Sequence, residues 1–198
     1  MAQTSNQQIT SLVKIPEFVM GLRKLPESAF TGIAGVLEYL KVHPIDPASL
    51  EPFLMWDRQH YTRNLVDHTD LYDLIAICWE VGQCSSIHNH KGQNCWMTVP
   101  VGRLLVQNYH VKHESLDEQR CDLEPTNVVE MNPNAPLAVD PIDPVHSVYN
   151  PKEFNERAVS LHVYSHPFDS CVVYSVEQHT CGEIKLRFNS QYGIPSRH

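Results

Sequence analysis

The chain has 198 residues, of which 42% are hydrophobic and 19% are charged, and its formal net charge is -8. A chain of this length can bury one core, and none of its apolar runs approaches the ~20 residues that a membrane-spanning helix needs. We therefore expect one domain without a membrane partner. The acidic balance, with no cluster of basic and aromatic residues, argues against a nucleic-acid partner.

The N-terminal sequence MAQTSNQQITSL is polar and has no basic segment leading into an apolar one. This composition predicts no secretory signal, and a cytoplasmic location is the expectation. The cysteines form no C-x-x-C pair and are expected to be free thiols in such a protein. They are Cys78, Cys84, Cys95, Cys121, Cys171 and Cys181.

From Ile9 to about Leu54, apolar residues recur at intervals of three and four, which predicts amphipathic helices. A helix is expected from about Ser28 to Lys41, with Ser28 as a candidate N-cap. Prolines divide the region into two or three short helices, at Pro16, Pro26, Pro44 and Pro47.

Beyond Trp56 the sequence changes to short runs of β-favouring residues separated by turn residues, which predicts strands. The runs cover residues 58–68, 71–81, 85–90, 94–102, 103–113, 127–131, 146–150, 157–166, 170–176 and 183–190. The pattern predicts a mainly β fold, with a small antiparallel barrel or sandwich over about residues 56–198 and a helical cap over about residues 1–55. The proline-rich segment from Asn132 to Pro144 is expected to be a shaped loop of the same domain.

His88 and His90 stand two residues apart in a segment of strand-like composition, so their side chains are expected on one face, ~7 Å apart at the backbone. Two imidazoles in this arrangement can share a metal ion. No Asp or Glu lies between Val81 and Asn108, so any carboxylate ligand has to come from elsewhere. Among 12 histidines a chance H-x-H is common, and taken alone the two residues are better explained as a surface pair.

Two longer motifs reverse that preference, because both resemble motifs of the cupin superfamily. The first combines Gly82, His88, His90, Cys95 and Gly102, with Cys95 where most cupins carry a metal-binding Glu. The second combines Pro141, Asp143, His146 and Asn150, with Asp143 in place of the usual Gly. Together they imply a small antiparallel cupin barrel of the jelly-roll type, with His88, His90 and His146 as the metal ligands.

Three neutral imidazoles leave up to three positions of an octahedral metal ion open, whereas a structural zinc site is closed by four protein ligands. The expected site is therefore one that receives a substrate. Without a carboxylate ligand the metal keeps its double positive charge, so an anionic donor such as a thiolate is the natural partner.

Further motifs narrow the resemblance to one family. They are Tyr61-Thr-Arg63-Asn-Leu-Val-Asp67, Cys78-Trp79, Ser85-Ser-Ile-His88, Cys95, His146-x-Val148-x-Asn150 and Ser160-Leu-His162-x-Tyr164-Ser165-x-Pro167-Phe168-Asp169-x-Cys171. On these motifs the chain resembles the animal-type cysteine dioxygenases from about Trp56 to Gly193.

That resemblance implies a mononuclear non-haem Fe(II) ion, one per chain, held by His88, His90 and His146. It implies an enzyme that adds both atoms of O2 to the thiol of L-cysteine and gives cysteine sulfinic acid, a step of cysteine catabolism toward taurine and sulfate. The partners are then L-cysteine and O2. A monomer is also implied, and no exposed heptad pattern contradicts it.

The resemblance also assigns substrate contacts. Arg63 pairs with the substrate carboxylate, a task that suits a planar guanidinium because it stays charged when desolvated. Tyr61 donates a further hydrogen bond, and Trp79 and Cys171 line the pocket. Taken alone, Arg63 would be read as a solvated residue of a polar loop.

The same resemblance pairs Cys95 with Tyr164 in a thioether that serves as a protein-derived cofactor. His162, two residues before Tyr164 and so on the same face of the strand, is then expected to hydrogen-bond the phenol. Ser160, two residues further back, is expected to steady His162. Without the resemblance, Cys95 would be read as a small core residue.

One local departure concerns the residues after Tyr164. The family commonly has Ser-Pro-Pro-Phe there, with a cis peptide at the first proline, whereas this chain has Ser165-His166-Pro167-Phe168. A cis bond is far less favourable before a residue other than proline, so the conformation of this turn stays open. His166 is not expected to be a fourth ligand, because it lies past the expected end of its strand.

Alternatives remain within and outside this enzyme class. A dioxygenase of a related thiol would act on cysteamine, against which Arg63 argues, or on 3-mercaptopropionate, against which Cys95 and Cys171 argue. A cupin that binds metal without turnover, or a metal-dependent isomerase, would not need the set of Arg63, Cys95, His162 and Tyr164 around three histidines.

Overall fold

The computed structural model describes residues 11–133 and 135–196. Its first elements are helical, and they are α1 (Ile15–Leu22), α2 (Ser28–Thr31), α3 (Ile33–Val42) and the 3-10 helix η1 (Pro47–Phe53). No helix within these ranges is long and apolar enough to cross a membrane. Most of the polar N-terminal segment, on which the signal prediction rests, lies outside the described residues.

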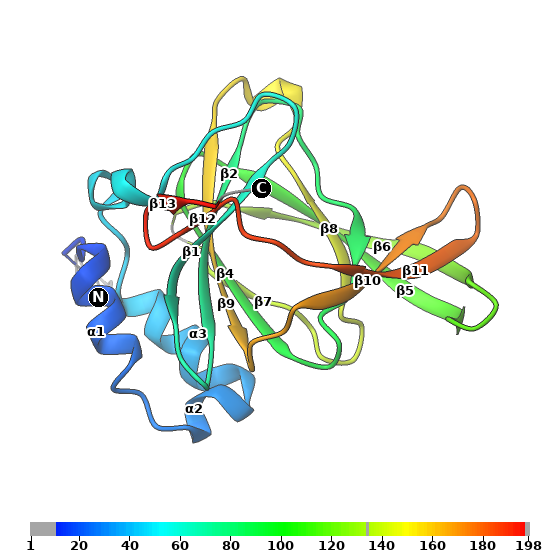
Figure 1. Ribbon diagram of the computed structural model, residues 1–198, viewed down its shortest axis with the longest axis horizontal. Coiled ribbons are helices and arrows are strands. Elements are labelled where there is room, and N and C mark those ends of the chain that lie inside the picture. Colours follow the sequence, from blue (N-terminus) through cyan, green and yellow to red (C-terminus); the bar gives the residue numbers. More distant parts are fainter. Residues whose placement is uncertain (1–10, 134, 197–198) are drawn as a thin grey trace, which may run out of the picture.

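The strands follow the helices along the chain. They are β1 (Thr62–His68), β2 (Asp73–Trp79), β3 (Ile87–His88), β4 (Asn94–Val101), β5 (Leu104–Ser115), β6 (Arg120–Met131), β7 (Leu137–Ala138), β8 (Val145–Tyr149), β9 (Ala158–Ser165), β10 (Ser170–Ser175), β11 (Thr180–Lys185), β12 (Ser190–Gln191) and β13 (Ile194–Pro195), with the 3-10 helix η2 (Lys152–Phe154) between β8 and β9. One sheet has the order β13-β12-β1-β2-β9-β4-β7, and the strands β10-β11-β6-β5-β8-β3 close on one another (Figure 1). The predicted mainly β barrel with short N-terminal helices is confirmed.

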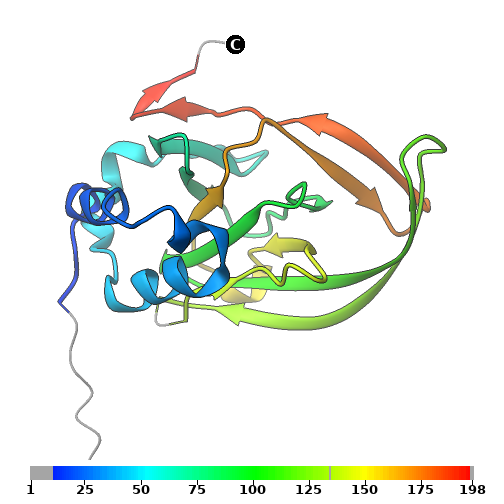
Figure 2. The ribbon, with the colours of Figure 1, turned by 90° about the horizontal axis from the view of Figure 1, so that it is seen from below.

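The larger sheet separates two cores, because successive side chains of a strand point to opposite faces. On the outer face, Leu74 and Ala76 of β2 pack with residues of the helices. On the inner face, Ile75, Ile77 and Trp79 pack against side chains of the other strands. Helices α1 to α3 cover the outer face of this sheet (Figures 1 and 2), so the inner face is left for a site inside the barrel.

The helix expected from about Ser28 to Lys41 is divided into α2 and α3 at Gly32, which has an extended backbone (φ -125°, ψ 168°). The break allows Gly35 of α3 to approach Ala29 of α2 so closely that a Cβ at Gly35 would lie 2.7 Å from the Ala29 Cα. The expected N-cap is wrong as well. Ser28 lies inside α2, Glu27 occupies the N-cap position, and no side chain caps the helix.

Some strand boundaries also differ from the prediction. β6 begins at Arg120, well before the run at residues 127–131, and continues through Pro125. A proline is tolerated there because β6 pairs with β11 only at Arg120, so no neighbour on that side requires the missing N–H. β11 begins and ends earlier than residues 183–190, and the expected loop from Asn132 to Pro144 contributes β7, which pairs with β4.

The contact between α2 and α3 predicts that substitution destabilises the fold at one glycine and not at another. Gly35→Ala places a methyl group against the Ala29 backbone and should lower the free energy of unfolding by about 1–3 kcal/mol, as overpacking does. Gly32→Ala is the matched control, because a Cβ at Gly32 would have no atom within 4 Å and the φ of this residue suits alanine. Urea denaturation measures both, and equal stability of the two variants would contradict the close contact.

Candidate metal centre

Three histidine side chains converge inside the barrel. His88 lies on β3, His146 lies directly opposite it on β8, and His90 follows two residues after His88. One possible ligand atom from each residue lies within 4.8 Å of the others, and the ring centroids are 4.8 to 5.2 Å apart. This spacing fits three nitrogens around a single metal ion.

The state of these imidazoles supports the same interpretation. His90 and His146 are each 1% exposed, and neither ring nitrogen of either residue has a hydrogen-bond partner among the described residues. Burial lowers the pKa of both well below the usual value, with the charge of neighbouring histidines adding to the effect, and burial lowers the pKa of His88 to about 4. The rings are neutral at neutral pH, and their unpaired nitrogens fit a bound metal ion.

Local contacts orient two of the rings. The Nδ1–H of His88 donates to the carbonyl oxygen of Ser86 at 2.9 Å, which leaves Nε2 of the neutral ring as its free ligand atom. His90 follows Asn89, whose Oδ1 accepts from the backbone N–H of Val172 at 3.0 Å and whose own N–H donates to the Val172 carbonyl at 3.1 Å. Strand β10 therefore holds the turn that carries His90.

The expectation that His88 and His90 share one strand is wrong. β3 contains only Ile87 and His88, and His90 lies past its end. The two side chains nevertheless face the same place because the Asn89 contacts to β10 fix the backbone after the strand. His146 comes from a distant part of the sequence and reaches His88 only through the antiparallel pairing of β3 with β8.

Cys95 and Tyr164 lie beside this group and directly opposite each other on the paired strands β4 and β9. Cys95 is 0% exposed and Tyr164 is 3% exposed. The Tyr164 ring lies 5.6 Å from the His90 ring, nearly parallel to it. Burial raises the pKa of both the thiol and the phenol, so both groups are neutral at neutral pH.

A chain of hydrogen bonds runs along the inner face to Tyr164. The indole N–H of Trp79 donates to Ser160 Oγ at 2.9 Å, and Ser160 Oγ lies 2.8 Å from Nε2 of His162. His162 Nδ1 lies 3.1 Å from the hydroxyl of Tyr164. The contacts expected from the alternation of Ser160, His162 and Tyr164 along β9 are therefore present.

The direction of this chain depends on the tautomer of His162. Burial lowers the pKa of His162 to about 3, and the charge of Arg63 adds to the effect, so the ring is neutral and carries one proton. The Ser160 oxygen accepts from Trp79, and its own proton is available for Nε2 of His162. In that tautomer Nδ1 carries the proton and donates to Tyr164, which leaves the phenol proton for a group in the site.

Arg63 of β1 brings a positive charge to the same space. Its Nε is buried and has no hydrogen-bond partner, and no carboxylate of the described residues forms an ion pair with its side chain. Its guanidinium carbon lies 5.9 Å from the ring centroids of Tyr164 and Phe188. A buried donor on a cation without a counter-ion fits an anionic ligand.

The remaining predicted pocket residues lie around Arg63. Tyr61 stacks on Trp79 with ring centroids 4.7 Å apart, and burial raises the pKa of Tyr61 while the charge of Arg63 opposes that rise. Burial also raises the pKa of the Cys171 thiol, again opposed by Arg63. The structure thus places Tyr61, Trp79 and Cys171 close to the candidate anion site.

Two aromatic residues of the site had no role in the sequence-based prediction. Phe168 packs edge-on against Tyr164 and His90, at 5.1 and 6.3 Å, and Phe188 lies against Arg63. Both come from the C-terminal part of the chain, and a phenylalanine in a strand or turn carries no signal of its own. His166 points elsewhere, with Nδ1 3.0 Å from the Asp70 carbonyl, and the peptide bond before it is cis.

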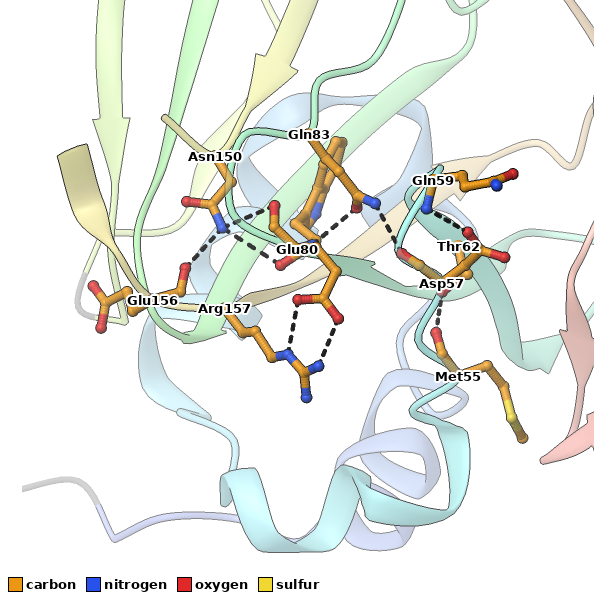
Figure 3. A network of polar contacts seen from close by, with 10 residues as sticks. Met55, Asp57, Gln59, Thr62, Glu80, Gln83, Asn150, Glu156 and Arg157 are labelled. Carbon is orange, nitrogen blue, oxygen red and sulfur yellow. Dashed lines mark hydrogen bonds and ion pairs between the residues drawn. The ribbon is translucent and has the colours of Figure 1, made fainter. Parts of the chain in front are cut away.

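A network of polar contacts links the end of β2, from which the chain continues to His88, to residues 150–157 (Figure 3). Asn150, at the end of β8, donates from Nδ2 to the carbonyl oxygens of Trp79, Glu80 and Glu156 at 3.4, 3.3 and 2.8 Å. Arg157 binds the Glu80 carboxylate through two nitrogens, at 2.9 and 2.6 Å. The end of β2, which carries Trp79, is thereby tied to the strand that carries His146.

Comparisons with known proteins were made for the whole chain. A family model described as cysteine dioxygenase type I matches residues 1–177. Cysteine dioxygenase type 1 of Rattus norvegicus is 28% identical over 190 residues, covering 93% of this chain and 92% of that protein. The protein of the same name from Homo sapiens is 27% identical over 188 residues, covering 90% of each chain.

A solved cupin superfamily protein from Desulfitobacterium hafniense aligns with a TM-score of 0.42 at 13% identity, over 63% of this chain and 92% of the solved chain. The matched range of the family model includes every site residue predicted from the sequence.

Removal of one imidazole tests the three-histidine geometry. His146→Ala should abolish retention of bound metal, because the remaining His88 and His90 cannot complete a three-nitrogen site. Metal content after gel filtration measures this result. His110→Ala is the control, because His110 is exposed and bonded to Asp143. Full metal content in the His146 variant would show that the third ligand is another residue.

Proposed function

Because this chain belongs to the cysteine dioxygenase type I family, we propose that it is an Fe(II)-dependent dioxygenase that converts L-cysteine to cysteine sulfinic acid. The family and the three-histidine group support an enzyme of the thiol dioxygenase class. The choice of substrate rests mainly on Arg63, whose buried Nε has no partner beside that group. L-Cysteine is a thiol that also carries a carboxylate for this cation.

We propose His88, His90 and His146 as the ligands of one Fe(II) ion per chain, since their unpaired neutral nitrogens fit such an ion. When bound, Fe(II) supplies a Lewis acid that favours the thiolate and an electron source for the activation of O2. The overall reaction, RSH + O2 → RSO2H, places both oxygen atoms on sulfur and needs no other reductant.

The protein's own residues bind and orient the substrate. The Arg63 guanidinium receives the carboxylate. The rings of Phe188 and Tyr164 lie beside the guanidinium, and an ion pair is stronger next to such apolar groups than in water. Tyr61, held flat against Trp79, offers its hydroxyl as a second donor to the same anion. With the carboxylate fixed at Arg63, the thiol of a small amino acid extends toward the histidines, which is catalysis by orientation.

Tyr164 is proposed to act through its hydroxyl proton. The chain from Trp79 through Ser160 and His162 ends in a donor to the phenol oxygen, so the phenol proton is directed to a group in the site. Burial keeps the phenol protonated, so it donates a hydrogen bond and carries no negative charge that would repel a thiolate or carboxylate. Ser160 and His162 are positioning residues for Tyr164.

Cys95 is proposed to form a thioether with the Tyr164 ring, in which an S–H and a ring C–H bond break, one C–S bond forms, and O2 accepts the two electrons and two protons. The two residues are directly opposite on β4 and β9, the arrangement that brings side chains of neighbouring strands closest. The link would fix the phenol in place and remove a thiol that could compete with the substrate for the metal.

Two related thiols are the alternative substrates. Cysteamine has no carboxylate and would leave Arg63 unpaired, whereas 3-mercaptopropionate has a carboxylate but no amine for an open position of the metal. A protein that binds metal without turnover is a further alternative. Arg63 and Tyr61 favour a thiol with a carboxylate over cysteamine, and by the family resemblance Cys95 and Cys171 favour L-cysteine over 3-mercaptopropionate.

Replacement of Arg63 tests the substrate proposal. Arg63→Ala should weaken the binding of L-cysteine by ~2–4 kcal/mol, seen as a higher KM, because the carboxylate loses its charged partner. Turnover of cysteamine, which has no carboxylate, should not change. Oxygen uptake with both thiols provides the measurement.

Arg103→Ala is the matched control for this experiment, because Arg103 is exposed and pairs with Glu156 away from the histidines. It should leave both KM values unchanged. Equal losses on cysteine and cysteamine in the Arg63 variant would refute the role of Arg63 in carboxylate binding.

The proposed thioether has a mass signature. The intact wild-type protein should be two hydrogens lighter than its sequence mass, and Cys95→Ser should remove this difference. Cys78→Ser is the control, since Cys78 is equally buried but contacts Asn64. A wild-type protein that keeps its full sequence mass after turnover would show that the link does not form.

A further inference from the structure

The smaller set of strands closes through a weak seam. β6 and β11 pair at one registered position, Arg120 with Thr180, whereas β5 and β6 pair along most of their length. Two backbone hydrogen bonds flank the registered position, from Cys121 N–H to the His179 carbonyl at 3.1 Å and from Cys181 N–H to the Gln119 carbonyl at 3.2 Å. Closure of the ring thus depends on few interactions at this point.

Two thiols lie at this seam. Cys121 of β6 and Cys181 of β11 are next to the registered pair and on the same face of the sheet, because each is one residue away from it. The Cys121 thiol donates to the Thr180 carbonyl at 3.1 Å, and the Cys181 thiol donates to the Arg120 carbonyl at 3.3 Å. Each sulfur therefore contacts the backbone of the opposite strand.

The two thiols also lie close enough to affect each other. Burial raises the pKa of the Cys121 thiol, and the neighbouring Cys181 thiol adds to this rise. The residues are 3% and 5% exposed and pack in one apolar cluster with Leu123 and Val172. The two residues are diagonal neighbours across the registered pair, and each sulfur already lies on the backbone of the other's strand, so the bond requires rotation about their side-chain bonds toward each other.

We propose that Cys121 and Cys181 form a reversible disulfide that locks the β6–β11 seam of the barrel. The oxidant is a small-molecule disulfide, RSSR. The Cys121 thiolate attacks one sulfur of RSSR and releases one RSH, and the Cys181 thiolate then attacks the Cys121 sulfur and releases the second. In the balanced reaction, two protein thiols and RSSR give one protein disulfide and two RSH.

The surface at the seam assigns an order to the two cysteines. Cys121 lines an open groove of about 500 Å³ together with His113, Arg120 and His179, whereas Cys181 is not among its lining residues. We assign Cys121, the cysteine that borders this groove, as the attacking thiol and Cys181 as the resolving thiol. The β5–β6 and β10–β11 hairpins project from the same end of the molecule (Figures 1 and 2), so the bond would join two extended arms of the fold.

The proposed disulfide is connected to the metal centre through the pairing of β11 with β10 and of β10 with β3. β11 pairs with β10 along its whole length, and β10 pairs with β3 at Val173 and His88. β10 also carries Cys171 and holds Asn89, the residue before His90. A covalent bond at the seam would hold these strands as one closed unit, and by restricting the unfolded chain between residues 121 and 181 it would stabilise the fold.

Treatment of the folded, reduced protein with glutathione disulfide tests this proposal. Cleavage after glutamate gives two peptides with a single cysteine each, residues 119–130 with Cys121 and residues 178–183 with Cys181. Their disulfide-linked pair should appear, two fewer thiols should react with iodoacetamide, and the thermal midpoint should rise by ~5–15 °C. Dithiothreitol should reverse all three changes.

Cys181→Ser should keep glutathione attached at Cys121 and show no rise in Tm, whereas Cys84→Ser, which removes an exposed cysteine away from the seam, should behave as wild type. Absence of the linked peptide in oxidised, folded wild-type protein would overturn the proposal. A linked peptide without a rise in Tm would overturn the locking of the seam.

Discussion

A positive charge without a counter-ion is the constraint on which the candidate site depends. The Nε of Arg63 is buried and unpaired beside three uncharged imidazoles, of which His90 and His146 are buried and His88 is half-buried. A folded protein without a ligand tolerates such an arrangement only at a cost in stability, because desolvated charges and unpaired nitrogens are unfavourable. The cost is offset when a metal ion meets the nitrogens and an anion meets the guanidinium, so the site is shaped for both together.

The barrel supplies these groups from two sets of strands. The histidines come from β3, β8 and the turn after β3, whereas Arg63, Cys95 and Tyr164 come from β1, β4 and β9 of the larger sheet. The helices cover the outer face of that sheet (Figure 2), and its inner face carries polar residues such as Ser160 and His162. Asn150 links the two sets, because its Nδ2 donates to the carbonyl oxygen of Trp79 at the end of β2.

The sequence predicted those parts of the structure that depend on local alternation. The mainly β fold and the common face of Ser160, His162 and Tyr164 follow from the period of a strand, and the observed contacts agree with it. The break at Gly32 could not be predicted, because it depends on a close approach between two helices. The early part of β6 was missed, because a strand tolerates Pro125 only where its edge is unpaired, and that edge is known only from the sheet. His90 leaves the strand because of contacts with β10, and the neighbours Cys121 and Cys181 meet through a pairing between segments that are far apart in sequence.

The most direct test of the account is the fate of labelled oxygen. The iron-loaded protein, supplied with L-cysteine and 18O2, should consume one O2 for each cysteine and yield a sulfinate that carries both labelled atoms. The predicted product is four mass units heavier than the sulfinate formed in unlabelled O2. Iron-loaded, folded protein that consumes no O2 with L-cysteine, or that gives only cystine, would contradict the central claim.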